Sequence, residues 1–534
     1  MNRVRVLDCT LRDGGYCNQW RFGYENVKKI INGLVKSGIN IVECGFLTNK
    51  VEYQENRTKF TTMDEVAEVL PKNRSEKLFV CLMNYGEYNL EDIPPYDGTS
   101  LDGIRVAFHK KDMSKALEFC EGIKKKGYKV FVQAMVSLNY SDEEYLELIK
   151  RTNIIAPYAF YIVDSFGVMK GKDLTRLFYI VEHNLTESIY IGYHSHNNMQ
   201  LAYSNAQSLV SIQTKRKLII DASIFGMGRG AGNLNTELFV EFLNDTEGTE
   251  YKLQPLLTLI DEILNKFYQE NYWGYSLPNY LSASHNAHPN YASYLNDKQT
   301  LTIEDMDAIF SMMSNEKKAS FDKEYIEALY TNYMANGKSY EEHIVELKKT
   351  LFGKKILIIA PGKSSEVEKA KIIQFAEQHD VVSISINFDY NYLYTDFIFL
   401  SNLRRYRELN KSKRYKCIVT SNIPAENIYI KTKYGQLLND VEAVRDNAGM
   451  MLIQFLINLG VKDIIIAGID GYSHEVSENY ADEQMALITK NAILDAMNTG
   501  MTNLLTRFAN KVKITFLTGP RRVTIANLDL LDNI

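Results

Sequence analysis

The stretch that decides the fold of this chain spans residues 4–16 and reads VRVLDCTLRDGGY. It opens as a short strand rich in valine and leucine, and it ends in an Arg-Asp pair followed by two glycines. Runs of the same strand type recur through the first 245 residues. They lie at residues 4–9, 39–46, 78–83, 104–108, 130–136, 160–163, 189–193 and 218–224. Helix-like patterns fill the intervals, so the alternation predicts an α/β fold, a (β/α)8 TIM barrel rather than a doubly wound open sheet.

Two further regions follow the barrel pattern. After residue 250 the strand signals stop, and helical periodicity with many aromatic residues continues to residue 348. Residues 354–364, KKILIIAPGKS, restart the strand pattern, and later strand candidates lie at 381–386, 397–400, 417–420, 428–430, 463–467 and 512–517. We therefore expect three parts: a barrel at 1–250, a helical extension at 251–348 and a Rossmann-like α/β domain at 349–534.

The composition excludes several classes of protein. Lysine plus arginine number 61 and aspartate plus glutamate number 66, which gives a net charge of −5. This balance provides no electrostatic reason to expect nucleic acid or an anionic membrane as a partner. No run approaches the ~20 apolar residues of a membrane span. The six cysteines are spread without a C-x-x-C pair, so we expect a reduced, cytoplasmic protein. The sequence leaves open whether it forms a homo-oligomer.

Charged and metal-binding residues gather where barrel strands end. Arg12 and Asp13 follow the first strand, and His194 and His196 end the seventh. Residues i and i+2 of a strand share a face, so the two imidazoles are expected to project together. With a carboxylate and open positions, they form a metal site suited to chelating a substrate. The alternative is a surface ion pair in a turn and two polar loop histidines.

A glycine-rich loop follows the eighth strand at residues 225–237, FGMGRGAGNLNTE. Gly226 and Gly228 fit the first two positions of G-x-G-x-x-G, and Ala231 takes the third. A dinucleotide fingerprint should open a βαβ unit, however, and this loop ends a barrel. The position therefore counts against a dinucleotide site.

Together these clusters resemble the DRE-TIM metallolyase superfamily, which includes 4-hydroxy-2-oxovalerate aldolase, 3-hydroxy-3-methylglutaryl-CoA lyase and the isopropylmalate synthases. The matching segments are residues 11–14, 43–46, 164–167, 194–197 and 228–233. The resemblance implies that Asp13, His194 and His196 ligate Mn²⁺ or Mg²⁺, with Asn233 as a further ligand in some members.

The resemblance also implies a reaction. The metal would chelate a 2-oxo acid such as pyruvate, and Arg12 would face the developing negative charge. A carbon–carbon bond to an aldehyde would then break or form through an enolate. Substrate contacts are expected from Glu43, Arg105, Asp164 and Ser165.

One position departs from the aldolase pattern. The hydroxy-oxovalerate aldolases carry a histidine base three residues after the metal aspartate, and here that position is Tyr16. A tyrosine of ordinary pKa is a poor base. Tyr16 would act through water, or His288, Tyr291 or His109 would move the proton, or the reaction differs. The residues are also compatible with an acyl-CoA condensing enzyme on the same barrel, and with a binding module that holds a structural metal.

The C-terminal part carries weaker signals. Gly362, Lys363 and Ser364 follow a buried strand and predict a generic anion site, but not a Walker A loop, because position 357 is leucine. Asp470 lies in a second strand-ending turn. The region resembles, more weakly, the nucleotide-binding fold of bacterial sialyltransferases. That resemblance implies a nucleotide or nucleotide-sugar ligand, and a bifunctional protein with glycosyltransferase activity. A structural appendage is the alternative.

Overall fold

The structure is a computed structural model that describes residues 3–74, 76–298, 300–335, 341–482, 485 and 489–523. The chain divides into two compact units. The first comprises Met1–Ser293 and Ser314–Phe321, and the second comprises Tyr294–Met313 and Asp322–Ile534. The helical segment expected at 251–348 is therefore shared between the two units.

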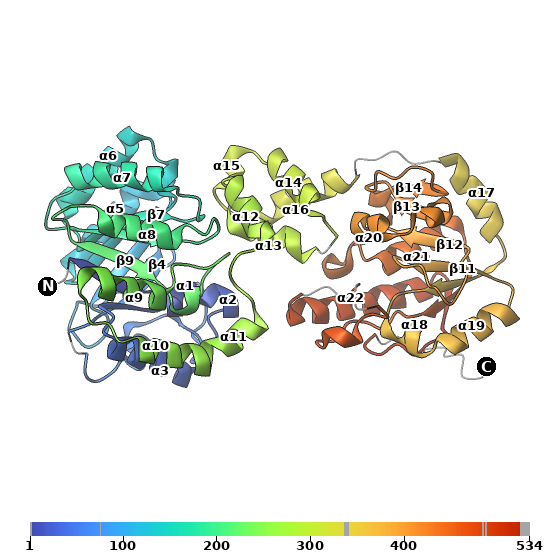
Figure 1. The fold of residues 1–534 in the computed structure, drawn as a ribbon, viewed down its shortest axis with the longest axis horizontal. Helices are drawn as coiled ribbons and strands as arrows, with labels where there is room; N and C mark the ends of the chain where they lie inside the picture. Colours follow the sequence, from blue (N-terminus) through green and yellow to red (C-terminus); the bar gives the residue numbers. More distant parts are fainter. Residues whose placement is uncertain are drawn as a thin grey trace. The chain divides into compact units, whose positions relative to one another are not determined.

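Eight parallel strands of the first unit close into a barrel (Figure 1). They are β1 (Val4–Asp8), β2 (Ile41–Leu47), β4 (Leu78–Asn84), β5 (Gly103–Phe108), β6 (Lys129–Ala134), β7 (Ala159–Asp164), β8 (Tyr190–Ser195) and β9 (Leu218–Ala222). The first strand closes the ring because it pairs with β9 on one side and with β2 on the other. The predicted fold class is confirmed, and each predicted barrel strand lies within two residues of an observed one.

Helices cover the outside of this barrel. The main ones are α3 (Tyr24–Ser37), α5 (Met113–Lys125), α6 (Asp142–Ile155), α7 (Gly171–Asn184), α8 (Ala202–Ser211) and α9 (Thr236–Glu247). In α3, the apolar side chains of Val27, Ile30 and Leu34 lie on one face of the helix and are buried. Gly38 ends this helix with a φ of +90° and donates its N–H to the carbonyls of Leu34 and Val35. Since all eight strands are parallel, their carboxyl ends meet at one rim, where such barrels place their active sites.

The loops at that rim are covered by the aromatic segment that follows α9. Helices α10 (Leu253–Leu259), α11 (Asn265–Glu270) and α12 (Leu277–Ser284) continue the chain after the barrel. The indole N–H of Trp273 donates to the carbonyl of Phe225 at 2.9 Å, and the Phe225 ring contacts the rings of Trp273 and Tyr268. The aromatic residues thus pack against the loop that follows β9.

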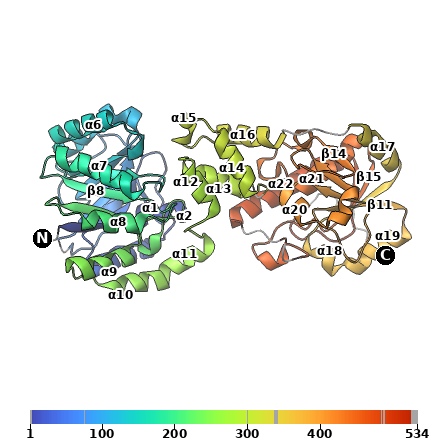
Figure 2. The same ribbon diagram turned by 45° about the horizontal axis from the view of Figure 1, so that its top comes forward.

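The second unit contains a fully parallel sheet of seven strands with helices on both sides (Figure 2). Its strands are β10 (Lys355–Ile359), β11 (Val381–Ile386), β12 (Phe397–Leu400), β13 (Cys417–Thr420), β14 (Ile430–Thr432), β15 (Asp463–Ala467) and β16 (Lys513–Phe516). The order is β14-β13-β12-β11-β10-β15-β16. The chain therefore builds one half of the sheet outward from β10 and then returns to build the other half from β15.

The helices that flank this sheet are α17 (Glu341–Leu351), α19 (Lys369–Gln378), α20 (Leu403–Glu408), α21 (Ala448–Leu459) and α22 (Asn491–Ala509). Helices α14 (Ile303–Met312) and α16 (Lys323–Ala335) of the same unit pack against each other. Leu357 and Ile359 pack with Ile372 and Phe375 of α19, while Ile358 is buried on the opposite face. Burial on both faces explains why these strands read as continuous apolar runs. Among the described residues, no helix has the length and hydropathy needed to cross a membrane.

The loop after β10 binds a carboxylate of the protein itself. The N–H of Ser364 donates to the carboxylate of Asp470 at 2.7 Å, and the Ser364 hydroxyl donates to the same carboxylate. The Ser364 donors are therefore occupied by the protein, and nucleotide binding by Gly362, Lys363, Ser364 and Asp470 stays a prediction. Asp470 joins the ends of β10 and β15.

Candidate metal centre

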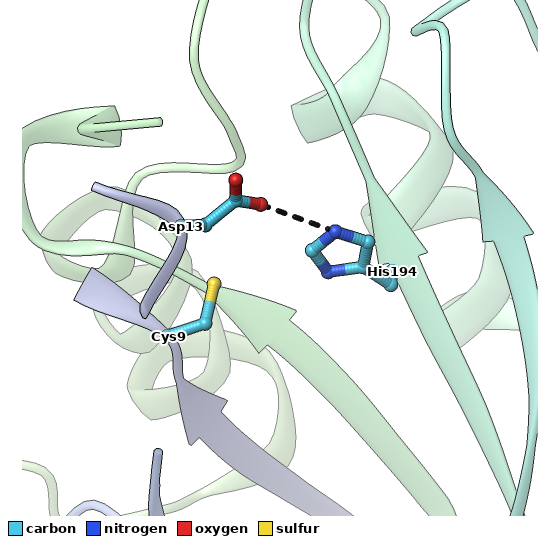
Figure 3. A group of neighbouring side chains, drawn as sticks. All are labelled: Cys9, Asp13 and His194. Atoms are coloured by element: carbon cyan, nitrogen blue, oxygen red, sulfur yellow. Dashed lines mark ion pairs between the residues drawn. The ribbon is translucent and has the colours of Figure 1, made fainter. Parts of the chain in front are cut away.

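The carboxylate of Asp13 lies at the centre of a group of possible metal ligands at the barrel rim. Its Oδ2 atom is 3.3 Å from Nε2 of His194 and 3.4 Å from Nε2 of His196. The amide of Asn233 donates to the same oxygen at 3.0 Å. In Figure 3, Asp13 reaches from the turn after β1 toward His194 on β8. The structure therefore brings together the four residues predicted to ligate the metal.

Local hydrogen bonds fix the turn that carries Asp13. The carboxylate of Asp8 accepts from the N–H of Thr10 at 3.0 Å and from the hydroxyl of Thr236 at 2.6 Å. The short helix α1 (Thr10–Asp13) begins at this point. The glycine-rich loop, in turn, is shaped around Asn233, since a Cβ atom on Gly228 would lie only 2.7 Å from the Asn233 amide nitrogen. The glycines thus position a polar side chain and do not open a βαβ unit.

A ring of charged side chains links these residues across the barrel interior. In order, its members are Asp13, Arg12, Glu43, Arg105, Asp221 and His194. Arg12 joins Asp13 at 3.1 Å to Glu43 at 2.8 Å. Arg105 joins Glu43 at 2.8 Å to Asp221. Three carboxylates face two guanidinium groups. Burial lowers the pKa of the sixth member, His194, but its contacts with Asp13 and Asp221 outweigh burial and raise the pKa.

The electrostatics keep Asp13 ionised. Burial opposes its charge, but Arg12, His196 and His194 together outweigh burial and hold the pKa of Asp13 well below its usual range. Burial also lowers the pKa of His196 to about 4, although Asp13 opposes this change. The site therefore presents an anionic carboxylate beside a neutral imidazole, which is the protonation state that a metal requires.

Hydrogen bonds on the far side of each imidazole leave its Nε2 atom available. Nδ1 of His194 lies 2.9 Å from Oδ2 of Asp221, and Nδ1 of His196 lies 3.2 Å from the carbonyl of Asp164. Each Nδ1–H donates to its acceptor, which places the lone pair on Nε2. Among the described residues, Oδ1 of Asp13, Nε2 of His196 and Oδ1 of Asn233 are buried without a hydrogen-bond partner.

These unsatisfied atoms fit a divalent cation. Buried polar atoms normally have a partner, and three acceptor atoms without one in a single site need a positive group. Carboxylate and amide oxygens suit hard cations such as Mn²⁺ and Mg²⁺ better than they suit a soft metal. Cys9 also lies in this cluster, its sulfur within 4.8 Å of ligand atoms of Asp13 and His194. Its thiol donates to the carbonyl of Ala222 at 3.3 Å, and burial raises its pKa well above the usual value, so it is not expected to act as a thiolate ligand.

The four residues predicted to bind substrate form hydrogen bonds or ion pairs with other parts of the protein. Both oxygens of Glu43 are paired with arginines, and Arg105 is fully buried within the barrel. The carboxylate of Asp164 accepts the N–H groups of Val168 and Met169 at 3.0 Å. Direct contacts of Glu43, Arg105 and Asp164 with substrate stay a prediction, and the charged groups of these residues already have partners within the protein.

The fourth of these residues, Ser165, accepts the N–H of Val136 at 2.9 Å through its hydroxyl oxygen. Its carbonyl accepts from the guanidinium of Arg229 at 2.8 Å. This serine therefore connects two rim loops, and the contact of its side chain with substrate stays a prediction.

The predicted base candidates differ in their surroundings. The hydroxyl of Tyr291 is buried against the carbonyls of Lys317 and Ser320 at 2.8 Å each, and the catalytic role of Tyr291 stays a prediction. His288 lies 3.3 Å from Arg229, and burial together with this guanidinium lowers the pKa of His288 to about 2. Burial also lowers the pKa of His109.

Tyr16 lies at the rim among aromatic rings. Its ring contacts Trp20 at 4.8 Å and Phe46 at 6.4 Å between centroids, and the Arg229 guanidinium lies 5.5 Å from its centre. Desolvation raises the pKa of Tyr16, although Arg229 opposes it. At neutral pH Tyr16 therefore keeps its proton and is a hydrogen-bond donor rather than a base.

Two residues of the site, Asp221 and Arg229, were not predicted from the sequence. Asp221 was visible as the one charged residue in the apolar strand LIIDA at 218–222. Arg229 lies inside the glycine-rich loop, which was interpreted from the backbone properties of its glycines. Its Nε atom is buried without a hydrogen-bond partner among the described residues. A lone charge in a buried strand is the signal that would have found Asp221.

The fold and the site together define the class of protein. It is a closed α/β barrel with a buried cluster of carboxylate and imidazole groups, possible metal ligands, at its rim. Residues 3–262 match the HMGL-like family model. The chain is 28% identical over 245 residues to a 4-hydroxy-2-oxovalerate aldolase of Geobacillus genomosp. 3, covering 45% of this chain and 70% of that protein. It is 25% identical over 241 residues to an oxaloacetate decarboxylase of Mycobacterium tuberculosis, covering 45% and 69%.

Among solved structures, the HMG-CoA lyase of Brucella melitensis aligns with a TM-score of 0.40 at 15% identity, covering 50% of this chain and 98% of that one. The barrel of this chain, residues 3–262, is an HMGL-like domain of the DRE-TIM metallolyase superfamily, as its motifs predicted. It is accordingly the barrel of a metal-dependent lyase.

Proposed function

We propose that the barrel cleaves or forms a carbon–carbon bond next to the carbonyl of a 2-oxo acid such as pyruvate, with Mn²⁺ or Mg²⁺ held by Asp13, His194, His196 and Asn233. The observation that carries this proposal is the convergence of two imidazoles and an amide on the Asp13 carboxylate, with unsatisfied acceptor atoms left over. When bound, such a cation supplies a Lewis acid for the carboxylate and 2-oxo oxygens of the substrate.

Arg12 supports the same chemistry from the protein side. Its Nη1 and Nε atoms are held by Asp13 and Glu43, so the plane of the guanidinium is fixed. Among the described residues, its Nη2 atom has no recorded hydrogen bond, which leaves it to donate to a substrate oxygen on which negative charge develops. Arg229 adds a second positive group at the rim and suits the substrate carboxylate.

A second candidate reaction is decarboxylation of a 2-oxo diacid such as oxaloacetate. Aldol cleavage needs a base to take the proton of the substrate hydroxyl, whereas loss of carbon dioxide does not. The candidates near the site are poor bases at neutral pH, because the pKa of His288 is about 2, the raised pKa of Tyr16 keeps it protonated, and Tyr291 is engaged elsewhere. One relative bears the name oxaloacetate decarboxylase. Tyr16, which keeps its proton at neutral pH, would then donate that proton to the resulting carbanion.

The test uses the full-length protein, stripped of metal and reloaded with Mn²⁺. Exchange of the pyruvate methyl protons for deuterium, followed by NMR, reports enolate formation. Metal-dependent exchange supports the proposal, and its absence with both Mn²⁺ and Mg²⁺ contradicts it. Oxaloacetate and 4-hydroxy-2-oxopentanoate, each followed by release of pyruvate, then distinguish decarboxylation from aldol cleavage. Coenzyme A release from acetyl-CoA and pyruvate would instead favour a condensing enzyme.

A further inference from the structure

The second unit contains a cavity of about 630 Å³. A volume of this size accommodates a ligand as large as a nucleotide. Its floor is formed by residues that directly follow four strand ends. They are Pro361 and Gly362 after β10, Asn387 after β11, Asn402 after β12 and Asp470 after β15. The cavity thus lies at the carboxyl edge of the parallel sheet.

The order of the strands indicates why a ligand site is expected at this edge of the sheet. Strands β11 to β14 extend the sheet from one side of β10, and β15 and β16 extend it from the other. The loops after β10 and β15 therefore leave the sheet in opposite directions. In open parallel sheets such a reversal of order creates a crevice, and ligands bind there. The cavity of this unit opens at that reversal.

Two glycines allow the loops to form the floor. The N–H of Gly362 donates to the carbonyl of Gly468 at 3.0 Å. A Cβ atom on Gly362 would lie 2.2 Å from that carbonyl oxygen, and one on Gly468 would lie 2.0 Å from the carbonyl oxygen of Ala360. Any larger residue at either position would separate the two loops. The close contact of backbones keeps the crevice free of side chains at its base.

Polar groups face the cavity without being fully satisfied. The Oδ1 atom of Asn387 is buried without a hydrogen-bond partner among the described residues, and so is the hydroxyl of Thr489. Asn387 adopts a left-handed backbone conformation with a φ of +56° directly after β11. This strand end, beside the first strand, is where doubly wound domains place the side chain that selects a ribose or base.

A carboxylate marks a second side of the cavity. Oδ2 of Asp446 accepts hydrogen bonds from the hydroxyls of Thr300 at 3.2 Å, Tyr434 at 3.0 Å and Tyr330. Within the described part of the chain, Asp446 has no ion-pair partner, and no hydrogen bond is recorded for its Oδ1 atom. An acceptor of this kind suits the hydroxyl groups of a sugar ring.

The other residues that line the cavity favour some classes of ligand over others. The basic groups are already paired, Lys298 with Glu327 at 2.7 Å, Lys323 with Glu442 at 2.6 Å and Arg405 with Glu408 at 2.9 Å. A polyphosphate would therefore find little free positive charge. The other wall is apolar and comes largely from α22, with Ile493, Met497 and Met501. A flat ring packs well against such a surface.

We propose that this cavity binds the nucleoside part of a ligand. The heterocycle packs against the apolar wall and meets the amide of Asn387 at its edge, and the sugar hydroxyls donate to Asp446. Recognition of the nucleoside, rather than of its phosphates, follows from the paired basic groups and from the carboxylate of Asp470 in the loop after β10. The proposal is independent of the reaction proposed for the barrel.

The test is a calorimetric titration of the full-length protein with adenosine, guanosine, cytidine and uridine, and with the 5′-monophosphate of each. At least one nucleoside is expected to bind with a Kd below about 1 mM, and its monophosphate within about tenfold of that value. Failure of all eight compounds to bind overturns the proposal. Binding of inorganic tripolyphosphate in preference to every nucleoside and monophosphate overturns it as well.

Two variants locate the binding. Ala496→Trp places a large ring at the cavity and is expected to weaken nucleoside binding at least tenfold, whereas Ala509→Trp, exposed on the same helix and away from the cavity, is expected to leave it unchanged. Asn387→Gly tolerates the left-handed backbone and removes the unsatisfied Oδ1 atom, and a similar loss is expected. Unchanged binding in both Ala496→Trp and Asn387→Gly contradicts the assignment. Circular dichroism melts of each variant serve as the folding control.

Discussion

Oδ2 of Asp221 lies 2.9 Å from Nδ1 of His194, while Nε2 of the same imidazole lies 3.3 Å from Asp13. The two carboxylates thus contact the two nitrogens of one ring. Because Asp221 accepts the Nδ1 proton, it fixes the tautomer that leaves Nε2 free to bind a cation. Asp221 also pairs with Arg105, so the orientation of His194 depends on a residue buried in the barrel interior.

Asp221→Asn is therefore expected to weaken Mn²⁺ binding by about 10- to 100-fold without changing any proposed ligand. The amide keeps the size of the side chain, but it no longer determines the tautomer of His194, and it leaves Arg105 with one carboxylate partner. Titration with Mn²⁺, followed by electron paramagnetic resonance of the free ion, measures the change. Asp245→Asn, exposed on α9, is the matched control. An affinity equal to that of the unaltered protein would contradict the role of Asp221.

His196→Ala is expected to remove most of the bound metal, because Asp13, His194 and Asn233 alone give a poorer set of ligands. The experiment measures metal per protein chain by mass spectrometry after loading with Mn²⁺ and gel filtration. His183→Ala provides the comparison, since His183 is exposed on α7 and its Nδ1 atom lies 2.8 Å from the Tyr179 carbonyl. If both variants retain the same amount of metal, the assignment of His196 as a ligand fails.

Arg12→Lys should keep the metal but slow enolate formation by at least about 100-fold. An ammonium group can pair with Asp13 or with Glu43, but it cannot hold both and still direct a donor at the substrate oxygen. Deuterium exchange into pyruvate and metal content are measured on the same sample. Full exchange activity would refute the role, whereas loss of metal would indicate that Arg12 mainly supports Asp13.

Local pattern predicted a large part of this architecture. The spacing of strands such as 218–224 predicted the barrel, because each βα unit is encoded within about 30 consecutive residues. The rim position of Asp13, His194 and His196 followed from the rule that parallel strands end at one edge. These inferences need only the order of the elements along the chain.

Pairing between distant residues could not be predicted in the same way. The ring of charges that joins Glu43 to Arg105, and Arg105 to Asp221, connects strands that lie 62 and 116 residues apart. Their partners are fixed by the closing of the barrel and by side-chain packing, which a single sequence does not reveal. The same reason applies to Ser364. The anion that its N–H binds is the carboxylate of Asp470, which lies 106 residues further along the chain.

The buried carboxyl of Asp8 makes the stability of the barrel depend on pH. Burial raises its pKa from 3.8 to about 6, although hydrogen bonds from Thr236 and Thr10 oppose the shift. The raised value means that the protonated form stabilises the folded state. This contribution is complete below about pH 3.8, declines as the pH rises, and is lost above about pH 6. Its size is up to about 3 kcal/mol.

Asp8→Asn should therefore unfold at nearly the same temperature as the unaltered protein at pH 4, but at a higher temperature at pH 7.5. The neutral amide can still accept the N–H of Thr10, and it can donate to the Thr236 hydroxyl, so both contacts of the turn are retained. Circular dichroism melts between pH 4 and pH 8 measure the difference, with Asp245→Asn as an exposed control. A difference between Asp8→Asn and the unaltered protein that stays constant over this range would show that Asp8 does not carry the pH dependence. A variant that becomes relatively less stable as the pH rises would reverse the sign of the argument.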